Sequence, residues 1–187
     1  DLLTIGNQTR PDLFALRIDR PAPLPEAVVG VRERLTADGF VIDGLHRRDA
    51  RRRIAAIRDV GIASASIALL HGHRNSQHEE VLEEILRSMG FDHVSRSSAL
   101  SPFQGLLRRS QTASTDAYLG PVIAGYLRAV KDGLGAGARS LHVMTSAGGL
   151  VDTENFRAMD SLLSGPAGGV VGAAMSGQRA GASKVIA

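Results

Sequence analysis

The sequence has no cysteine and no tryptophan, and aromatic residues make up only 4% of its 187 residues. Without cysteine the chain has no disulfides and no thiolate metal sites, and its redox compartment stays open. No apolar run approaches the roughly 20 residues that a membrane-spanning helix needs, so we expect no membrane partner. Because 43% of the residues are hydrophobic, we expect a folded core built mainly from Ala, Leu, Val and Ile.

One basic stretch, residues 46–53 (HRRDARRR), stands out in a chain whose formal net charge is only +3. The pI of about 9.9 reflects a small excess of arginine, since almost nothing in this chain titrates between about pH 7 and 10. The stretch has no interleaved aromatic residues on which bases could stack. We interpret it as a solvated helix face and predict no nucleic-acid partner. Nucleic-acid binding through residues 47–53 is the alternative, and its affinity would fall steeply with salt.

The most unusual segment is residues 162–174 (LLSGPAGGVVGAA), which is helix-like but rich in glycine. In a helix interior each glycine costs about 0.8–1.0 kcal/mol relative to alanine. A missing side chain gains something mainly where another backbone or a ligand comes very close. With Ser164 as N-cap and Pro166 in the first turn, the amide donors of this end could face an anion. A tight helix crossing without a ligand is the other interpretation.

The first half of the chain predicts an α/β pattern. Apolar spacing and turn residues predict a proline-rich extended arm over residues 9–26, a hairpin over 28–45, a helix over 49–60, and strands over 65–70 and 91–95. Ser76 and Glu79 fit a capping box that opens a helix between these two strands, and Gly90 supplies its C-terminal stop. Strand, helix and strand in about thirty residues predict a right-handed parallel βαβ unit.

The second half is predicted to follow a boundary in the serine-rich residues 95–101, which gives domains over 1–101 and 102–187. We expect a helix over 115–134 that is interrupted or started near Pro121, a turn at 135–137, a strand over 141–144, a helix over 153–163 and a terminal strand that begins at 184–187. Residues 145–149 follow a strand at its carboxyl end, where ligands sit in open α/β sheets. A plain strand-to-helix turn is the alternative there.

Three histidines lie close together in the sequence, but they give only weak support for a metal site. His71 and His73 straddle the end of a predicted strand, His78 begins a helix, and no carboxylate pair completes a ligand motif. We therefore predict no metal bound by this chain. Nucleophilic catalysis has no support either, because the chain lacks cysteine and a G-x-S-x-G elbow. The sequence alone assigns no catalytic residue.

Several segments together resemble the ATP-dependent hydantoinase/5-oxoprolinase family, specifically its hydantoin-utilisation A-type subunit. They occur in family order over nearly the whole chain: residues 6–11 (GNQTRP), 68–79 (ALLHGHRNSQHE), 112–121 (TASTDAYLGP), 146–150 (SAGGL) and 163–173 (LSGPAGGVVGA). The resemblance implies an actin-like (ribonuclease H-like) ATPase fold, in which two lobes of mixed or parallel strands flanked by helices close on ATP and magnesium. It makes residues 1–101 the remainder of the family's N-terminal region and 102–187 the beginning of its core, with a hinge helix over 164–176.

The resemblance also implies the chemistry. Relatives use ATP to phosphorylate the amide oxygen of a cyclic amide, a hydantoin or 5-oxoproline, or act on ketones as carboxylase subunits. The family's Asp-x-Gly-Gly-Thr phosphate loops are expected before Asp1 and after Ala187, so the fragment alone is expected to be inactive. A cytoplasmic location and a B-type partner subunit or domain are further expectations. A non-catalytic scaffold or subunit-docking segment is the alternative function.

Two departures from the family leave the ring substrate open. Residues 104–109 (QGLLRR) stand where the family usually has an acidic residue, and Asp116 stands where asparagine is common. The expected contribution of this chain is backbone donation and close approach to nucleotide or substrate rather than acid or base catalysis. The residues predicted for this role are Ser146, Gly148, Gly149, Ser164, Gly165, Gly168 and Gly169.

Overall fold

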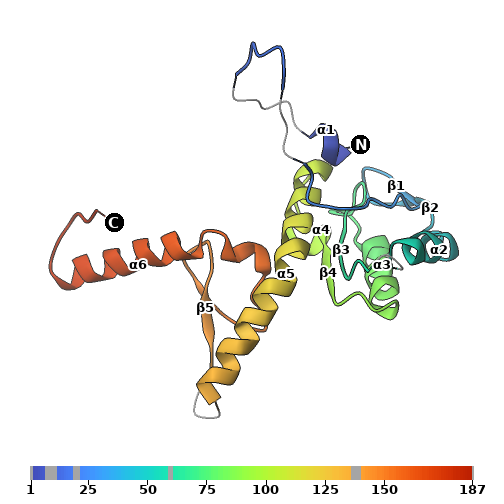
Figure 1. Cartoon of the computed structure of the whole chain (residues 1–187). Coiled ribbons are helices and arrows are strands. Elements are labelled where there is room, and N and C mark those ends of the chain that lie inside the picture. The colour runs from blue at the N-terminus through green and yellow to red at the C-terminus, as the bar shows by residue number, and fades with distance from the viewer. Residues whose placement is uncertain (1, 7–11, 19–21, 59–60, 136–139, 187) are drawn as a thin grey trace. The chain divides into compact units, whose positions relative to one another are not determined.

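The computed structural model describes residues 2–6, 12–18, 22–58, 61–135 and 140–186, and it shows a mixed α/β protein (Figure 1). The chain forms two compact units, Asp1–Tyr118 and Leu119–Ala187, which are described separately below. The boundary between the two units, after Tyr118, falls within helix α5 (Leu106–Leu134). The domain boundary predicted after residue 101 follows the family's sequence regions and stays a prediction.

A small antiparallel hairpin follows the N-terminal arm. Strands β1 (Arg34–Leu35) and β2 (Val41–Asp43) pair as the Asp-Gly turn predicts. Gly39 has φ +90°, a left-handed conformation that glycine adopts without steric cost. Helix α1 (Leu2–Ile5) precedes the arm, and the described parts of the arm, residues 12–18 and 22–26, contain neither helix nor strand.

The predicted parallel βαβ unit is confirmed. Strands β3 (Ser64–Ile67) and β4 (His93–Arg96) pair in parallel, connected by helix α3 (Gln77–Ser88). Helix α2 (Arg47–Arg58) packs on α3, and the buried side chains between these elements form one core. The fully buried members of this core are Ala50, Ile54, Ile67, Leu82, Ile85, Leu86 and Phe91.

The start of α3 differs from the predicted capping box. Ser76 has helical backbone angles and makes no side-chain cap bond, and its hydroxyl donates to Glu80 Oε1 at 2.7 Å. Instead, Asn75 Oδ1 accepts the Gln77 amide at 3.0 Å. Glu79 turns inward and is fully buried. The prediction of a capping box was therefore wrong because Glu79 finds backbone donors outside the helix.

Helix α5 is longer than predicted. It begins at Leu106, nine residues before the predicted start, and runs through Pro121 without interruption. Proline has no N–H for the carbonyl four residues earlier, which belongs to Ala117. The Ser64 hydroxyl of β3 donates to that carbonyl. A tertiary hydrogen bond thus satisfies the helical acceptor that Pro121 leaves unpaired.

The second unit contains the end of α5, a hairpin and a last helix. Strands β5 (His142–Met144) and β6 (Leu150–Asp152) pair antiparallel, and a short 3₁₀ helix η2 (Ala158–Ser161) leads to helix α6 (Ser164–Arg179). The strand over 141–144 is confirmed. The helix predicted over 153–163 was wrong, since η2 alone is helical there and β6 takes up residues 150–152. Residues 136–137 and Ala187 lie outside the described part, and residues 184–186 form no strand.

Helix α4 (Ser97–Leu100) directly follows β4 and completes the elements of the first unit. Among the residues that the structure describes, no helix is both long enough and apolar enough to cross a membrane.

Candidate functional site

The structure brings Ser146 to the start of α6. Both the backbone amide and the hydroxyl of Ser146 donate to the Asp160 carbonyl, at 2.8 and 2.6 Å. The Ser146 hydroxyl also accepts the Leu163 amide at 3.0 Å. Ser146 therefore joins the hairpin turn to the last residue before α6. Its hydroxyl already donates one hydrogen bond and accepts another within the chain.

Gly148 and Gly149 lie in a tight hairpin turn. The Thr145 amide donates to the Gly149 carbonyl at 2.8 Å, and the Gly148 amide donates to the Thr145 carbonyl at 2.9 Å. Gly148 has φ +82°, which explains why glycine stands there. Neither the open ligand loop of a parallel sheet nor a strand-to-helix turn describes this segment, because it connects two antiparallel strands.

Ser164 is the first residue of α6, not its N-cap. Leu163 occupies the cap position and makes no side-chain cap bond, while the Ser164 hydroxyl donates to the Ser161 carbonyl at 3.0 Å. Pro166 lies in the first turn as predicted. Since the Leu163 amide is bonded to Ser146 and Pro166 has no N–H, the backbone donors that this helix end presents are those of Ser164 and Gly165.

The glycines of α6 fall into two groups. A Cβ at Gly168 would lie 3.6 Å from Met144 Cγ of β5, and one at Gly148 would lie 3.4 Å from Val171 Cγ2 of α6. A Cβ at Gly165, Gly169 or Gly172 would meet nothing within 4 Å. The hairpin and the helix thus pack closely along one face, Gly165, Gly169 and Gly172 face open space in the described part of the chain, and Gly177 near the end of α6 is buried against Val185.

A second polar site, which the sequence analysis missed, lies in the first unit around Glu79. Its Oε1 accepts the Leu69 amide at 2.9 Å and the Ser97 hydroxyl at 2.7 Å. Its Oε2 accepts the Ser98 amide at 2.8 Å. One carboxylate therefore ties together the segment after β3 and the start of α4, which follows β4.

Arg109 of α5 is the counterion of Glu79. Its Nη1 lies 3.5 Å from Glu79 Oε1, and both side chains are at most 1% exposed. The guanidinium also donates to the Ser97 hydroxyl and, through Nη2 at 2.7 Å, to the Leu69 carbonyl. A buried charge pair needs such additional hydrogen bonds to offset desolvation. Arg109 belongs to the segment where the sequence departs from the family.

A signal for this site is present in the sequence. Glu79 precedes Leu82 and Leu86 at helical spacing, so it falls on the apolar face of α3. A charged residue on the core face of a helix is almost never fully buried unless it is paired. A glutamate in a capping box would lie at the surface, so the capping-box interpretation predicted no buried charge at Glu79. The distant partner, Arg109, could not be identified from spacing alone.

The three histidines have separate environments. His78 Nδ1 lies 2.7 Å from Glu33 Oε2, with both side chains almost completely buried. His71 and His73 have ring centroids 6.3 Å apart, and His71 has φ 64°. Burial, assisted by the charge of Arg109, lowers the pKa of His73 below its usual value. Among the described residues, no group of three or more His, Cys, Asp or Glu could hold a metal ion.

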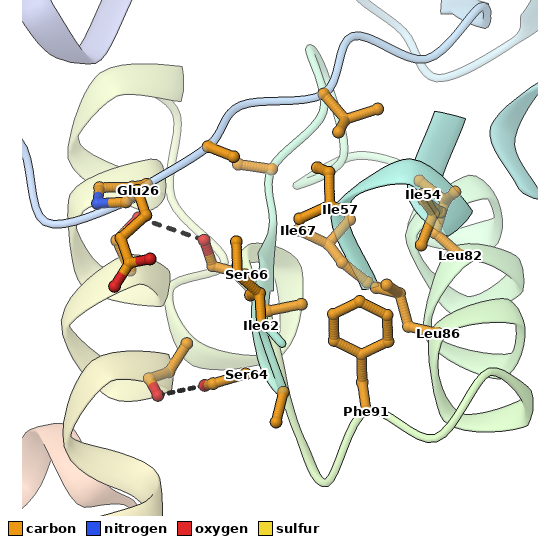
Figure 2. A pocket seen from close by; sticks show the side chains of 18 of the residues that line it. Glu26, Ile54, Ile57, Ile62, Ser64, Ser66, Ile67, Leu82, Leu86 and Phe91 are labelled. Atoms are coloured by element: carbon orange, nitrogen blue, oxygen red, sulfur yellow. Dashed lines mark hydrogen bonds between the residues drawn. The ribbon is translucent and has the colours of Figure 1, made fainter. Parts of the chain in front are cut away.

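A pocket of about 440 Å³ lies elsewhere in the first unit. Figure 2 shows the two faces of β3 in this pocket: Ser64 and Ser66 point toward α5, while Ile67 lies with Leu86 and Phe91 on the side of α3. The Ser66 and Ser114 hydroxyls are 3.2 Å apart. Because aliphatic side chains dominate the lining and none of the seven predicted site residues is part of it, we assign no chemistry to this pocket.

The basic stretch is partly neutralised within α2. Asp49 accepts from Arg52 at 2.5 Å and from Arg53 at 2.8 Å. The hydrogen bond from Arg53 is the largest cause that lowers the pKa of Asp49. Arg51 donates to the Ser88 hydroxyl of α3 at 3.0 Å. These arginines therefore have partners inside the protein on an exposed helix face.

Comparisons with known proteins match this chain to one family. The model of the hydantoinase/oxoprolinase N-terminal region matches residues 1–90, and the hydantoinase/oxoprolinase model matches residues 109–187. The 5-oxoprolinase of Saccharomyces cerevisiae is 38% identical over 201 residues, which cover 92% of this chain and 16% of that protein. The chain thus spans about a sixth of the length of this relative.

Two solved structures are similar. A nucleotide-free structure of acetone carboxylase, described as an ATP-dependent enzyme, matches 81% of this chain and 22% of that chain, at 26% identity and a TM-score of 0.65. An ATP-dependent caprolactamase from Pseudomonas jessenii matches 96% of this chain and 27% of that chain, with a TM-score of 0.75. At 22% identity the second likeness shows the fold alone. From the two family models and the oxoprolinase relative together, the chain belongs to the hydantoinase/oxoprolinase family.

Proposed function

We propose that the parent protein of this chain is an ATP-dependent enzyme that opens cyclic amides of the hydantoin or 5-oxoproline type. The observation that carries the proposal is the 38% identity to a 5-oxoprolinase over 92% of this chain. A caprolactamase with a similar fold supports it, since caprolactam is also a cyclic amide. Because the chain covers 16% of that oxoprolinase, the activity is assigned to the parent and not to this segment alone.

The chemical difficulty in this reaction is the low electrophilicity of an amide carbonyl. ATP, when bound, supplies the activation by transferring its γ-phosphoryl group to the amide oxygen. This chain contributes positions near nucleotide or substrate where a backbone comes close or an amide donates. We assign this role to Ser146, Gly148, Gly149, Ser164, Gly165, Gly168 and Gly169.

The described residues fit an anion at one point. The backbone N–H groups of Ser164 and Gly165 begin a helix of 16 residues, where the helix dipole and the amide donors favour a phosphate oxygen. They do not fit a metal, since no suitable group of ligands occurs among the described residues. In this proposal magnesium is assigned to other parts of the parent than these described residues, and no step is assigned to it here.

The remaining parts of the proposal concern the parent. We propose an actin-like fold with two lobes, α6 as the hinge helix between them, a B-type partner subunit or domain, and a cytoplasmic location. These assignments follow the family resemblance, and the likeness to two solved ATP-dependent enzymes supports the use of ATP that they assume. Helix α6 supports the hinge role, because a segment with a glycine-rich, open face can pass close to a neighbour.

The test uses the purified parent with ATP and magnesium. Phosphate release and ring opening are measured separately with hydantoin, 5-oxoproline and caprolactam, and acetone with bicarbonate serves as the ketone substrate. We expect phosphate release coupled to opening of at least one ring. Turnover of none of the cyclic amides would contradict the proposal. Carboxylation of acetone alone would support the carboxylase alternative, which the likeness to acetone carboxylase favours.

The second alternative, a scaffold or docking segment, is favoured by the exposed face of α6. Val170 is 60% and Met175 51% exposed, and the neighbouring Gly169 and Gly172 meet nothing within 4 Å. The variant Gly169→Leu separates the two functions, because its side chain would meet nothing in the described chain but would obstruct a partner docked on this face. A docking role predicts loss of partner assembly with unchanged nucleotide affinity of the parent, whereas the nucleotide-proximal role predicts weaker nucleotide binding.

A further inference from the structure

Three buried polar atoms without a hydrogen-bond partner gather around the Glu79 site. Within the described part of the chain, the buried side-chain atoms that lack a partner are His73 Nδ1, Ser98 Oγ and Arg109 Nε. An unpaired buried polar group costs about 1–3 kcal/mol, so each one calls for an explanation. Their gathering around one carboxylate is the observation from which the inference starts.

Ser98 and Arg109 interact with Glu79 directly, and His73 is connected to the site through Gly72 and Arg109. The Ser98 backbone amide donates to Glu79 Oε2, and Arg109 Nη1 lies 3.5 Å from Glu79 Oε1. Gly72, which precedes His73, lies so close that a Cβ there would be 2.5 Å from Glu79 Oε1. The charge of Arg109 also acts on His73. The unpaired atoms are therefore not scattered but belong to one cluster.

The place of the cluster in the fold favours a ligand. Leu69 and His73 follow the carboxyl end of β3, and Ser97 and Ser98 follow the carboxyl end of β4. These two strands are parallel neighbours, so both ends lie at the same edge of the sheet. Ligands of open α/β proteins bind at this edge. The buried Glu79 and Arg109 fix the two segments there through backbone hydrogen bonds.

The chemistry of the three atoms matches a neutral amide. Arg109 Nε and the Ser98 hydroxyl are donors, and Nδ1 of a neutral imidazole with its proton on Nε2 is an acceptor. Glu79 already compensates the charge of Arg109, so an uncharged group suits the site better than an anion. A secondary amide presents one carbonyl acceptor and one N–H donor. We propose that Arg109, Ser98 and His73 bind the amide group of the cyclic substrate, an assignment that rests on the proposed function.

Access to this site requires the loop after Leu69, residues 70–76, to move. The three atoms lie beneath the surface, and Gly72 of the loop contacts Glu79. His71 holds φ 64° in the same loop, a left-handed conformation that costs a non-glycine residue free energy and is most frequent at functional sites. Opening of this loop is therefore part of the proposal.

The first test compares Ser98→Ala with Ser88→Ala in the full-length parent. Ser98 of α4 offers an unpaired hydroxyl. The Ser88 hydroxyl, at the C-terminal end of α3 away from Glu79, donates to the Ile85 carbonyl and accepts from Arg51. We expect Ser98→Ala to raise KM for the cyclic amide about tenfold with an unchanged melting temperature. Ser88→Ala is expected to lower the melting temperature with an unchanged KM. An unchanged KM for Ser98→Ala would overturn the proposal. If the KM is unchanged and the melting temperature of Ser98→Ala falls, the Ser98 hydroxyl binds a buried water instead of the substrate.

The second test does not require turnover. Binding of 2-pyrrolidinone and of its N-methyl form to the parent without ATP is measured by calorimetry, before and after His73→Phe. We expect the wild type to prefer the form with the N–H group and the variant to lose most of that preference. Equal preference in both proteins would overturn the assignment of His73. If the wild type opens no cyclic amide but binds 2-pyrrolidinone through these residues, the proposed function fails while the amide site stands.

Discussion

At the scale of single residues, Glu79 and Arg109 show how a charge pair can be buried. Each is at most 1% exposed, and the carboxylate accepts three hydrogen bonds besides its contact with Arg109. Such satisfaction is necessary because the desolvation penalty of a buried pair can exceed its Coulombic gain. Removal of one partner therefore costs more than the pair itself contributes.

We predict that Glu79→Gln lowers the free energy of unfolding by about 3–5 kcal/mol, because Arg109 is left as an uncompensated buried charge. Urea denaturation of the chain measures this loss. Glu84→Gln on the exposed side of the same helix is the control, with an expected change within about 0.5 kcal/mol. The double variant Glu79→Gln with Arg109→Met should be less destabilised than Glu79→Gln alone. Equal effects of Glu79→Gln and Glu84→Gln would contradict the prediction.

His73 gives stability a pH dependence with a defined sign. Burial, the charge of Arg109, and further charge from Arg74 and His71 lower its pKa in the folded state below the usual 6.5. The contribution of His73 is therefore complete above about pH 6.5 and is lost as the pH falls toward its folded pKa, because the unfolded chain binds the proton first. Denaturation of the wild type and of His73→Phe from pH 8 to pH 5 should show a smaller acid loss in the variant. Parallel curves would exclude this role.

At the scale of elements, tertiary contacts decided where helices begin and end, which the spacing of apolar residues did not predict. Repeated apolar positions predicted α2, α3 and both strands of the βαβ unit, and the Asp-Gly pair predicted the β1–β2 hairpin. The N-terminus of α3 could not be predicted because asparagine and serine both commonly cap helices and here Asn75, not Ser76, does so, while Glu79 accepts from donors that follow the two strands. Pro121 predicted a helix break, but α5 continues because the Ser64 hydroxyl donates to the Ala117 carbonyl that Pro121 leaves unpaired.

The Ser64 hydrogen bond to α5 can be measured with a double-mutant cycle. We predict that Ser64→Ala destabilises the chain by about 1–3 kcal/mol, because it leaves the Ala117 carbonyl without its donor. In a Pro121→Ala background the helix supplies its own N–H to that carbonyl. The effect of Ser64→Ala should then fall substantially. Additive effects of the two substitutions would show that they act independently.

Alanine substitutions test whether the glycines of α6 are needed for the fold of this chain. A Cβ at Gly169 or Gly172 meets nothing in the described chain, so each alanine substitution should stabilise the helix by about 0.5–1 kcal/mol. Gly148→Ala is the contrasting variant and should destabilise, because Gly148 has φ +82°. Circular dichroism and denaturation of the chain measure both. A loss of stability with Gly169→Ala would reveal a neighbour within this chain that the contacts do not show.

At the scale of the whole molecule, the chain is a small part of proteins of its family. It covers 16% of the yeast relative and 27% of the solved caprolactamase. Because the chain makes up so small a share of these relatives, we predict that it shows no ATP hydrolysis above background by itself. Release of phosphate from ATP is the measurement, with the parent as positive control, and hydrolysis by the chain itself would contradict the prediction.

The sequence by itself determined the family, the mixed α/β class and the elements whose signals are local. Periodic apolar residues fix a helix face, and a glycine with positive φ fixes a turn, because both depend on neighbours in the chain. Only the tertiary structure placed Arg109 against Glu79, bonded Ser64 to Ala117 and turned residues 145–149 into a hairpin. These contacts join residues far apart in the sequence or depend on which strand a segment pairs with, and neither follows from residue type and spacing.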